Sequence, residues 1–242
     1  MSANVRFCSP RMNRASAIAL LLSGVVLQPA YAEEDYERLP WMAEEVANYH
    51  KEQKQLQGDS LKGALLRAEK YLNSLRTIRA DFTQTDPNGG SATGKFFLER
   101  PGKMRWQYNP PVPILMVTKG SSLVYVDYEL EQVTHIPLQS TIAGVIAQKT
   151  IDLEKDVDII EVRAGAGSIR IALAQKGELD EGLLVLEFEE EPTMRLSRMV
   201  IGDATGQMTR IDLSEAEYNI ALDDSLFTFT DPRGEDKLRV RR

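Results

Sequence analysis

The sequence predicts a mainly β protein, in which one antiparallel sheet, open or closed, carries an apolar cavity capped by a few short helices. Three observations predict it. Some ten strand-like segments follow one another through short turns, as in up-and-down sheets. Their alternation places apolar side chains on one face and charged side chains on the other. Only two apolar helical segments are available, too few to fill a wide sheet but enough to cap a concavity.

The first residues are typical of a secretory signal peptide. Three arginines precede an apolar run of 13 residues, Ala15 to Leu27, and the small-x-small site Ala30-Tyr31-Ala32 follows it. A membrane-spanning helix needs about 20 apolar residues, so a retained anchor is the weaker alternative. We therefore expect residues 1–32 to be removed by cleavage after Ala32.

Cysteine content and charge restrict the class of protein. The only cysteine, Cys8, lies in the leader, so the mature chain should carry no disulfide and no lipid on cysteine. The leader holds three of the 29 basic residues and none of the 36 acidic ones, which leaves a net charge of −10. We therefore expect no nucleic-acid partner and no anionic membrane surface. For the basic tail at 235–242, a solvated end and a docking element both remain open.

A charged extension and one helix precede the strands. The extension at 33–59 has weak periodicity, and we expect it to be mobile or partly helical. Ser60 is a suitable N-cap for the helix that follows. Apolar residues then recur at spacings of three and four, which predicts an amphipathic helix. These residues are Leu61, Leu65, Ala68, Leu72 and Leu75.

The remaining chain alternates like strands. It starts with Thr77–Thr85 and a turn at "NGG". The stretch Gly94–Tyr108, "GKFFLERPGKMRWQY", is typical of two strands around a Pro-Gly turn. A short apolar helix is expected at Ser140–Gln148, where the spacing is helical. The other expected strands are Ile114–Thr118, Ser122–Tyr128, Gln132–Ile136, Val157–Arg163, Ser168–Ala174, Leu183–Glu189, Leu196–Ile201, Met208–Leu213 and Phe227–Thr230.

The two faces of this sheet are expected to differ in polarity. The apolar face carries Phe96, Leu98, Met104, Trp106, Tyr108, Ile169, Ile171, Leu173, Leu184, Leu186, Phe188, Ile211 and Leu213. The polar face carries Lys95, Glu99, Arg105, Gln107, Arg170, Glu187, Arg210 and Asp212. An apolar sheet face must be covered, and only the two helical segments can cover it. We expect them to form the lid of an apolar cavity.

An arginine ends the apolar stripe of the first Gly94–Tyr108 strand. Phe96, Leu98 and Arg100 share one face, so Arg100 should lie at the rim of the apolar surface, where the chain turns. A guanidinium has five donors and suits several carbonyl acceptors at once. The residues alone leave two interpretations open, a turn arginine that points into water and a fastening for the lid.

Groupings of residues that perform catalysis are not found in the sequence. The two histidines, His50 and His135, give no metal cluster, and no nucleophile has a base at recognisable spacing. The stretch Gly165–Ser168 resembles a phosphate loop only superficially, because it lacks the following lysine and opens a strand. We expect a hairpin turn there. The sequence favours a binding protein without catalytic residues, metal or cofactor over an enzyme.

Three motifs resemble one known family. "LRTIRADFTQT" at 75–85, "GKFFLERPGKMRWQY" at 94–108 and "FTFTDPRG" at 227–234 resemble, in this order, the periplasmic outer-membrane lipoprotein carrier family, LolA. The resemblance covers roughly Leu61–Gly234 and implies a carrier domain at 60–234. It implies an incomplete, half-open antiparallel β-barrel with a helical lid over an apolar cavity.

The resemblance also implies roles for particular residues. Arg100 takes the place of the family's arginine that hydrogen-bonds lid carbonyls at the cavity mouth, with Leu72 and Ile146 as the lid residues facing it. Met104 stands where phenylalanine is common in the family, and methionine adapts to irregular partners. The residues expected to bind acyl chains are Phe82, Phe96, Leu98, Met104, Trp106, Tyr108, Ile142, Leu186 and Ile211.

The function implied by the resemblance is that of a periplasmic carrier. It would bind the acyl chains of lipoproteins released by an inner-membrane transporter and deliver them to the outer membrane, through an acceptor if one is present. It would act as a monomer without cofactor. The alternative is a periplasmic regulatory protein that senses lipid or lipoprotein. Such sensors carry a second domain, for which we expect no length to remain.

Overall fold

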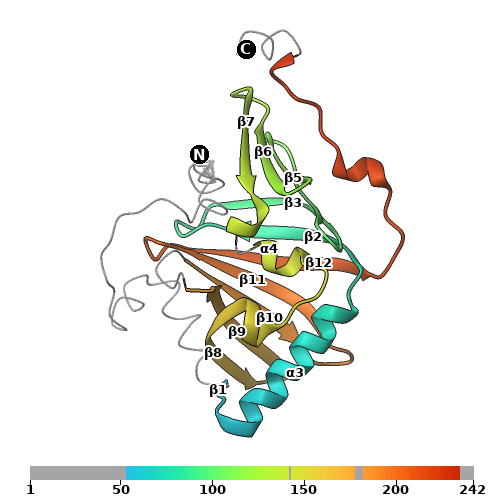
Figure 1. Ribbon diagram of the computed structural model, residues 1–242. Coiled ribbons are helices and arrows are strands. Elements are labelled where there is room, and N and C mark those ends of the chain that lie inside the picture. Colours follow the sequence, from blue (N-terminus) through green and yellow to red (C-terminus); the bar gives the residue numbers. More distant parts are fainter. Residues whose placement is uncertain (1–52, 142, 178–181, 235–242) are drawn as a thin grey trace, which may run out of the picture.

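The computed structural model describes residues 53–141, 143–177 and 182–234, which form one antiparallel sheet and a few helices (Figure 1). The strands are β1 Lys54–Gln55, β2 Thr77–Thr85, β3 Ser91–Glu99, β4 Lys103–Tyr108, β5 Ile114–Lys119, β6 Ser122–Asp127, β7 Gln132–Pro137, β8 Val157–Gly165, β9 Ser168–Gln175, β10 Gly182–Glu189, β11 Arg195–Asp203 and β12 Met208–Tyr218. The helices are α3 Gly58–Ser74, α4 Ala143–Ala147 and α5 Leu153–Asp156, with 3-10 turns η2 Leu138–Ser140 and η3 Asp224–Phe227.

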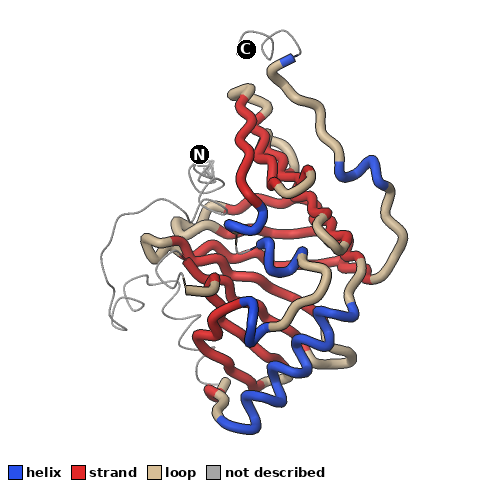
Figure 2. The backbone as a smooth tube through the Cα atoms, in the orientation of Figure 1, coloured by secondary structure: helices blue, strands red, loops and turns tan. Residues whose placement is uncertain are grey.

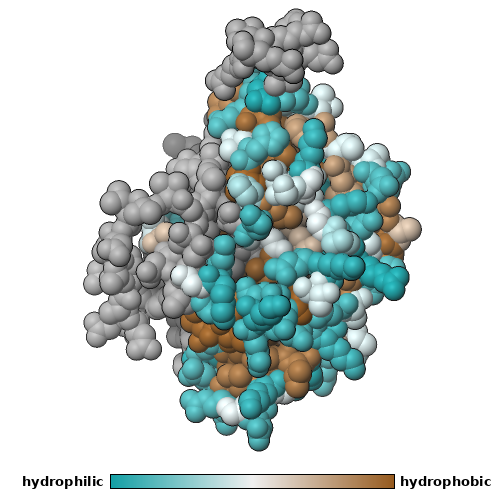
Figure 3. Space-filling view, in the orientation of Figure 1, coloured by the Kyte–Doolittle hydropathy of each residue, from teal (hydrophilic) through white to brown (hydrophobic). Residues whose placement is uncertain are grey.

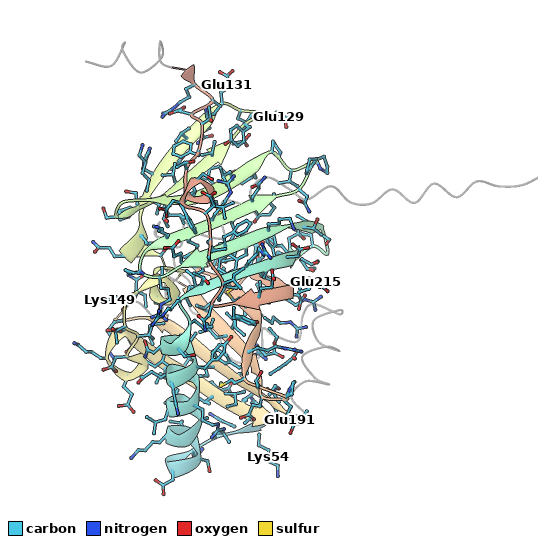
Figure 4. The ribbon with its side chains drawn as sticks, turned by 90° about the vertical axis from the view of Figure 1, so that its right-hand side faces the viewer. Lys54, Glu129, Glu131, Lys149, Glu191 and Glu215 are labelled. Carbon is cyan, nitrogen blue, oxygen red and sulfur yellow. The ribbon has the colours of Figure 1, made fainter. Side chains whose placement is uncertain are left out.

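The strand order is β1-β8-β9-β10-β11-β12-β2-β3-β4-β5-β6-β7, so the sheet has two edges, β1 and β7. These edges lie at opposite ends of the molecule. In Figure 4, Lys54 of β1 is near one end, and Glu129 and Glu131, in the turn before β7, are at the other. The sheet is open, and the predicted fold class of a half-open antiparallel barrel is confirmed.

Helices α3, α4 and α5 lie on one face of the sheet, whereas the turn η3 belongs to the C-terminal segment (Figure 2). Helix α3 turns Ala64, Leu65, Ala68 and Leu72 into the main hydrophobic core, as its spacing predicts. The helix begins earlier than expected, because its N-cap is Gln57, without a side-chain cap, and Ser60 lies in the first turn. A second apolar helix was expected at 140–148, and η2 and α4 lie there. Helix α5 was not predicted.

The core lies between the helices and the sheet face that they cover. Cross-strand neighbours on this face pack as apolar pairs: Phe96 lies opposite Trp106, and Leu98 lies opposite Met104. All residues expected on the apolar face belong to this core, with Leu213 only partly buried at its margin. At about 25 cal/mol per Å² of apolar area, such burial is the main stabilising contribution to the fold.

The C-terminal segment corrects one prediction. A strand was expected at 227–230, but this segment is not among the strands of the described sheet, and it crosses the outer face of the sheet (Figure 4). Phe227 and Phe229 pack there against a second apolar cluster, Leu115, Val117, Val124 and Val126. Arg105 donates to the carbonyls of Leu226 at 2.8 Å and Thr228 at 2.9 Å. The two alternating phenylalanines therefore anchor a segment that lies across the described sheet and is not one of its strands. We call this C-terminal segment the strap.

The end of the charged extension joins the sheet. Residues 54–55 form β1, antiparallel to β8, and the Gln53 side chain donates to Ser168 Oγ at 2.7 Å. These two residues are therefore a strand and not helical, because they pair with the β8 edge. The turn Gly165–Ser168 joins β8 to β9 as a hairpin, as expected. Gly58 and Asp59, the last two residues of the extension, begin α3. The expected signal peptide, residues 33–52 of the extension and the basic tail lie outside the described residues.

Candidate functional site

Four aromatic side chains form the centre of the covered sheet face. The Phe96 and Trp106 ring centroids are 4.1 Å apart. Phe82 meets Trp106 at 6.3 Å and Tyr108 at 5.1 Å, both edge to face. None of the four is more than 4% exposed. Adjacent strands β2, β3 and β4 place them, because each contributes inward-facing residues at every second position.

A glycine makes this packing possible, and sequence reasoning missed it. A Cβ at Gly94 would lie 2.2 Å from the Gln107 carbonyl oxygen and 2.5 Å from Phe82 Cζ. No L side chain fits between this carbonyl and the ring. The available signal was a glycine inside an alternating strand, which often marks a close approach of backbone or ligand.

The other residues expected at the cavity share the same core. Leu98, Met104, Leu186 and Ile211 are at most 2% exposed, and all belong to the main cluster. The lid residues Leu72 and Ile146 are buried in it as well. Ile142 lies outside the described residues. In this state the expected acyl site is therefore closed, with side chains packed under the helices.

Arg100 joins two lid segments at the edge of this core. Its guanidinium donates to the carbonyls of Leu72 and Leu75 (3.3 Å) at the end of α3, and its Nε donates to the Gln148 carbonyl at 2.7 Å. On the second segment the acceptor is thus the carbonyl of Gln148, two residues beyond Ile146, whose side chain is buried in the core. Partial burial lowers the Arg100 pKa.

Backbone and amide groups add further links at the same place. The amide N–H of Gly102, two residues beyond Arg100, donates to the Ala147 carbonyl at 2.8 Å. The Asn73 side chain donates to the Ile151 carbonyl at 2.7 Å and accepts from its N–H at 2.9 Å. Sequence reasoning missed Asn73, whose only signal was a polar residue near the end of an amphipathic helix. The lid segments are thus hydrogen-bonded to the β3–β4 turn and to each other.

The chain is similar to proteins of one known family. A family model described as "Outer membrane lipoprotein carrier protein LolA" matches residues 73–230, well over half of the chain. The chain belongs to the LolA family. Proteins of this family named outer-membrane lipoprotein carrier protein include one from Methylococcus capsulatus, 34% identical over 70% of this chain and 85% of its own. One from Nitrosomonas europaea has the same identity and coverage.

Among solved structures, a LolA superfamily protein from Nitrosomonas europaea aligns with a TM-score of 0.40. It is 13% identical, and the alignment covers 69% of this chain and 97% of that one. The LolA family match contains Arg100, both strands of the Gly94–Tyr108 hairpin and the strap, but it begins at the end of α3.

The described residues of this LolA-family chain hold no group of three or more histidine, cysteine or acidic side chains that could bind a metal ion. In the same residues, no helix has the length and apolar character needed to cross a membrane. His135 lies on the edge strand β7, away from the aromatic core, and His50 lies outside the described residues. The described residues thus form an apolar interior whose edge is closed by polar hydrogen bonds from Arg100.

Proposed function

We propose that this protein is a periplasmic carrier that binds the acyl chains of lipoproteins and moves them from the inner to the outer membrane. One observation carries the proposal: an apolar sheet face, rich in aromatic rings, lies under helices that Arg100 fastens through backbone carbonyls. The names of its LolA-family relatives support the same role. No step of this role needs a catalytic group or a cofactor.

The energies allow reversible loading. A charge-assisted hydrogen bond contributes about 1.5–3 kcal/mol, so a few of them hold the lid against thermal opening. Burying one methylene gains about 0.8 kcal/mol, and a lipoprotein brings two or three long chains. The free energy gained by burying several methylenes can therefore exceed that of the hydrogen bonds that hold the lid, so acyl chains can displace it. Apolar side chains also reach the surface over α3 and β8–β10 (Figure 3). Displacement of the lid would expose more apolar surface next to them.

The partners of the carrier follow from this cycle. We infer that an inner-membrane lipoprotein-releasing transporter loads it, and that an outer-membrane acceptor, if present, unloads it. Acylated lipoproteins are the cargo, and the carrier acts as a monomer because one lid and one sheet face complete the site.

We expect the mature protein to release lipoprotein from membranes into solution. The measurement incubates it with inner-membrane vesicles that contain lipoprotein and the energised releasing transporter, and then assays the soluble fraction for a carrier–lipoprotein complex. Vesicles without added protein are the control. Absence of soluble complex under every energised condition would contradict the carrier role.

We also expect the periplasmic protein to start at Glu33. The apolar run and the Ala30-Tyr31-Ala32 site predict cleavage there. N-terminal sequencing of protein from the periplasmic fraction measures it. An intact leader on protein in the membrane fraction would mean an anchored protein, and the proposal of a freely diffusing carrier would then be wrong.

A further inference from the structure

Trp106 combines deep burial with a polar atom. It lies on β4, opposite Phe96 on β3 and Met116 on β5, and Phe82 packs edge-on against it. The side chain is 4% exposed. Its indole ring has a single polar group, the Nε1–H, which can only donate a hydrogen bond.

This N–H has no acceptor. Nε1 is fully buried and makes no hydrogen bond to any group in the described structure. Buried indole N–H groups usually find a partner, because leaving a donor unsatisfied in an apolar interior is costly. Nearby polar groups on the same sheet face are satisfied: Tyr108 donates to Gln84 Oε1 at 2.5 Å, and the Met104 N–H donates to Thr118 Oγ1. Among the described residues, the Trp106 N–H is thus a free donor beside apolar surface.

We propose that the Trp106 indole N–H binds a carbonyl oxygen of the acylated cargo, an inference that rests on the proposed carrier function. Methylene groups accept no hydrogen bond, so the acyl carbonyl is the one acceptor that an acyl chain itself brings into such a core. Both lipoprotein esters and an N-terminal acyl amide carry this group.

The position along the strands suits a carbonyl group. Arg100 marks the edge of the covered face, the Leu98–Met104 pair follows, and Trp106 lies one inward-facing position further. Two residues along a strand advance about 7 Å. Trp106 therefore lies two such steps, about 14 Å, inside the Arg100 edge. For its ester carbonyls to lie at this depth, the glyceryl end of the lipid enters past Arg100, and the methylenes continue further into the core.

The hydrogen bond would give the cavity a chemical preference. An apolar cavity alone binds acyl and alkyl chains according to the apolar area that they bury, whether an ester or an ether attaches them. A buried donor at fixed depth favours chains that bring an acceptor to that depth. The carrier would thereby prefer acylated cargo over plain hydrocarbon chains, which have no acceptor, and over ether-linked chains, which lack the carbonyl oxygen, and would hold its cargo in one register.

Three lipopeptide probes test the inference. All carry a cysteine with a glyceryl thioether: the first with two palmitoyl esters and a free amine, the second with two hexadecyl ethers and a free amine, and the third with two hexadecyl ethers and an N-palmitoyl amide. Affinities are measured for the wild type and Trp106→Phe, which keeps a ring but has no donor. The ester-to-ether affinity ratio should be about five- to tenfold higher in the wild type.

A spectroscopic measurement does not depend on that variant. The chain has two tryptophans, so Trp41→Phe leaves one indole N–H signal in a proton–nitrogen spectrum. The signal should move further downfield with the diester than with the diether, because only the diester brings a carbonyl oxygen. A shift restored by the third probe identifies the amide as a second source of the carbonyl.

Two outcomes would overturn the inference while leaving the carrier proposal intact. One is an equal ester-to-ether ratio in both proteins. The other is an unmoved indole signal while the diester binds. Failure of all three probes to bind the wild type would instead contradict acyl binding itself, and the carrier proposal would fall with the inference.

Discussion

Arg100→Leu is expected to load lipoprotein almost normally but to deliver roughly tenfold less of it to an acceptor membrane. The substitution removes the donors that now reach the carbonyls of Leu72, Leu75 and Gln148. In the loaded state, acyl chains keep the lid displaced, so that state loses little. The closed, empty state loses the bonds that stabilise it, and the free-energy difference that drives unloading becomes smaller. Loading and transfer are measured separately, by soluble complex and by acceptor-bound lipoprotein.

Two further variants make the comparison specific. Arg100→Lys should be intermediate, since an ammonium has three donors and no planar fork. Arg79→Leu is the matched control, because Arg79 is half-exposed and pairs with Glu217 away from the lid. Loss of this surface pair should leave transfer unchanged. If all three variants transfer like the wild type, Arg100 is only a residue of the turn, and the lid has another fastening.

The position of Arg100 could be predicted from the sequence, but its partners could not. Alternation along β3 and the Pro-Gly turn place a guanidinium at the end of an apolar stripe. Its acceptors are backbone carbonyls, which every residue carries, so no residue type marks them in advance. The segment around Ile146 could be predicted, but the acceptor within it could not: the carbonyl of Gln148, two residues beyond Ile146, accepts from the arginine.

The strap shows a second limit of sequence reasoning. Phe227 and Phe229 alternate as in a strand, because their rings pack on one flat apolar cluster and the side chains between them face away. The same period arises whether the backbone joins a ladder or crosses a sheet face. Whether such a segment becomes a strand depends on whether a free sheet edge lies beside it. The pairing of β12 with β2, which joins the two halves of the open sheet, is set by contacts between residues distant in sequence.

The aromatic centre was predicted more completely than the glycine that permits it. Phe82, Trp106 and Tyr108 stand out by size and alternation. Gly94 stands out only once the ring of Phe82 is known to lie over its Cα, since its backbone is not in the left-handed region. Glycine is required at position 94 because there is no space for a side chain between the strands, and not because of the backbone conformation.

Gly94→Ala is therefore expected to destabilise the protein by about 2–3 kcal/mol, which lowers Tm by about 4–12 °C for a domain of this size. The new Cβ overlaps the Gln107 carbonyl oxygen, a backbone atom that cannot move without shifting β4. It also displaces the Phe82 ring from Trp106. Thermal unfolding measures the stability, and binding of an acyl probe reports the disturbed aromatic centre.

Gly202→Ala is the matched control for this substitution. Gly202 also lies inside a strand, β11, with backbone outside the left-handed region, but its Cβ would meet side chains: Met208 Sδ at 2.8 Å and Leu183 Cγ at 2.9 Å. Flexible methionine and leucine side chains can move aside, so we expect a loss below about 1 kcal/mol. Equal Tm values for the two variants would mean that β4 yields as easily as a side chain. The aromatic centre would then not depend on glycine at 94, because a sheet that shifts at no cost cannot be holding Phe82 in place.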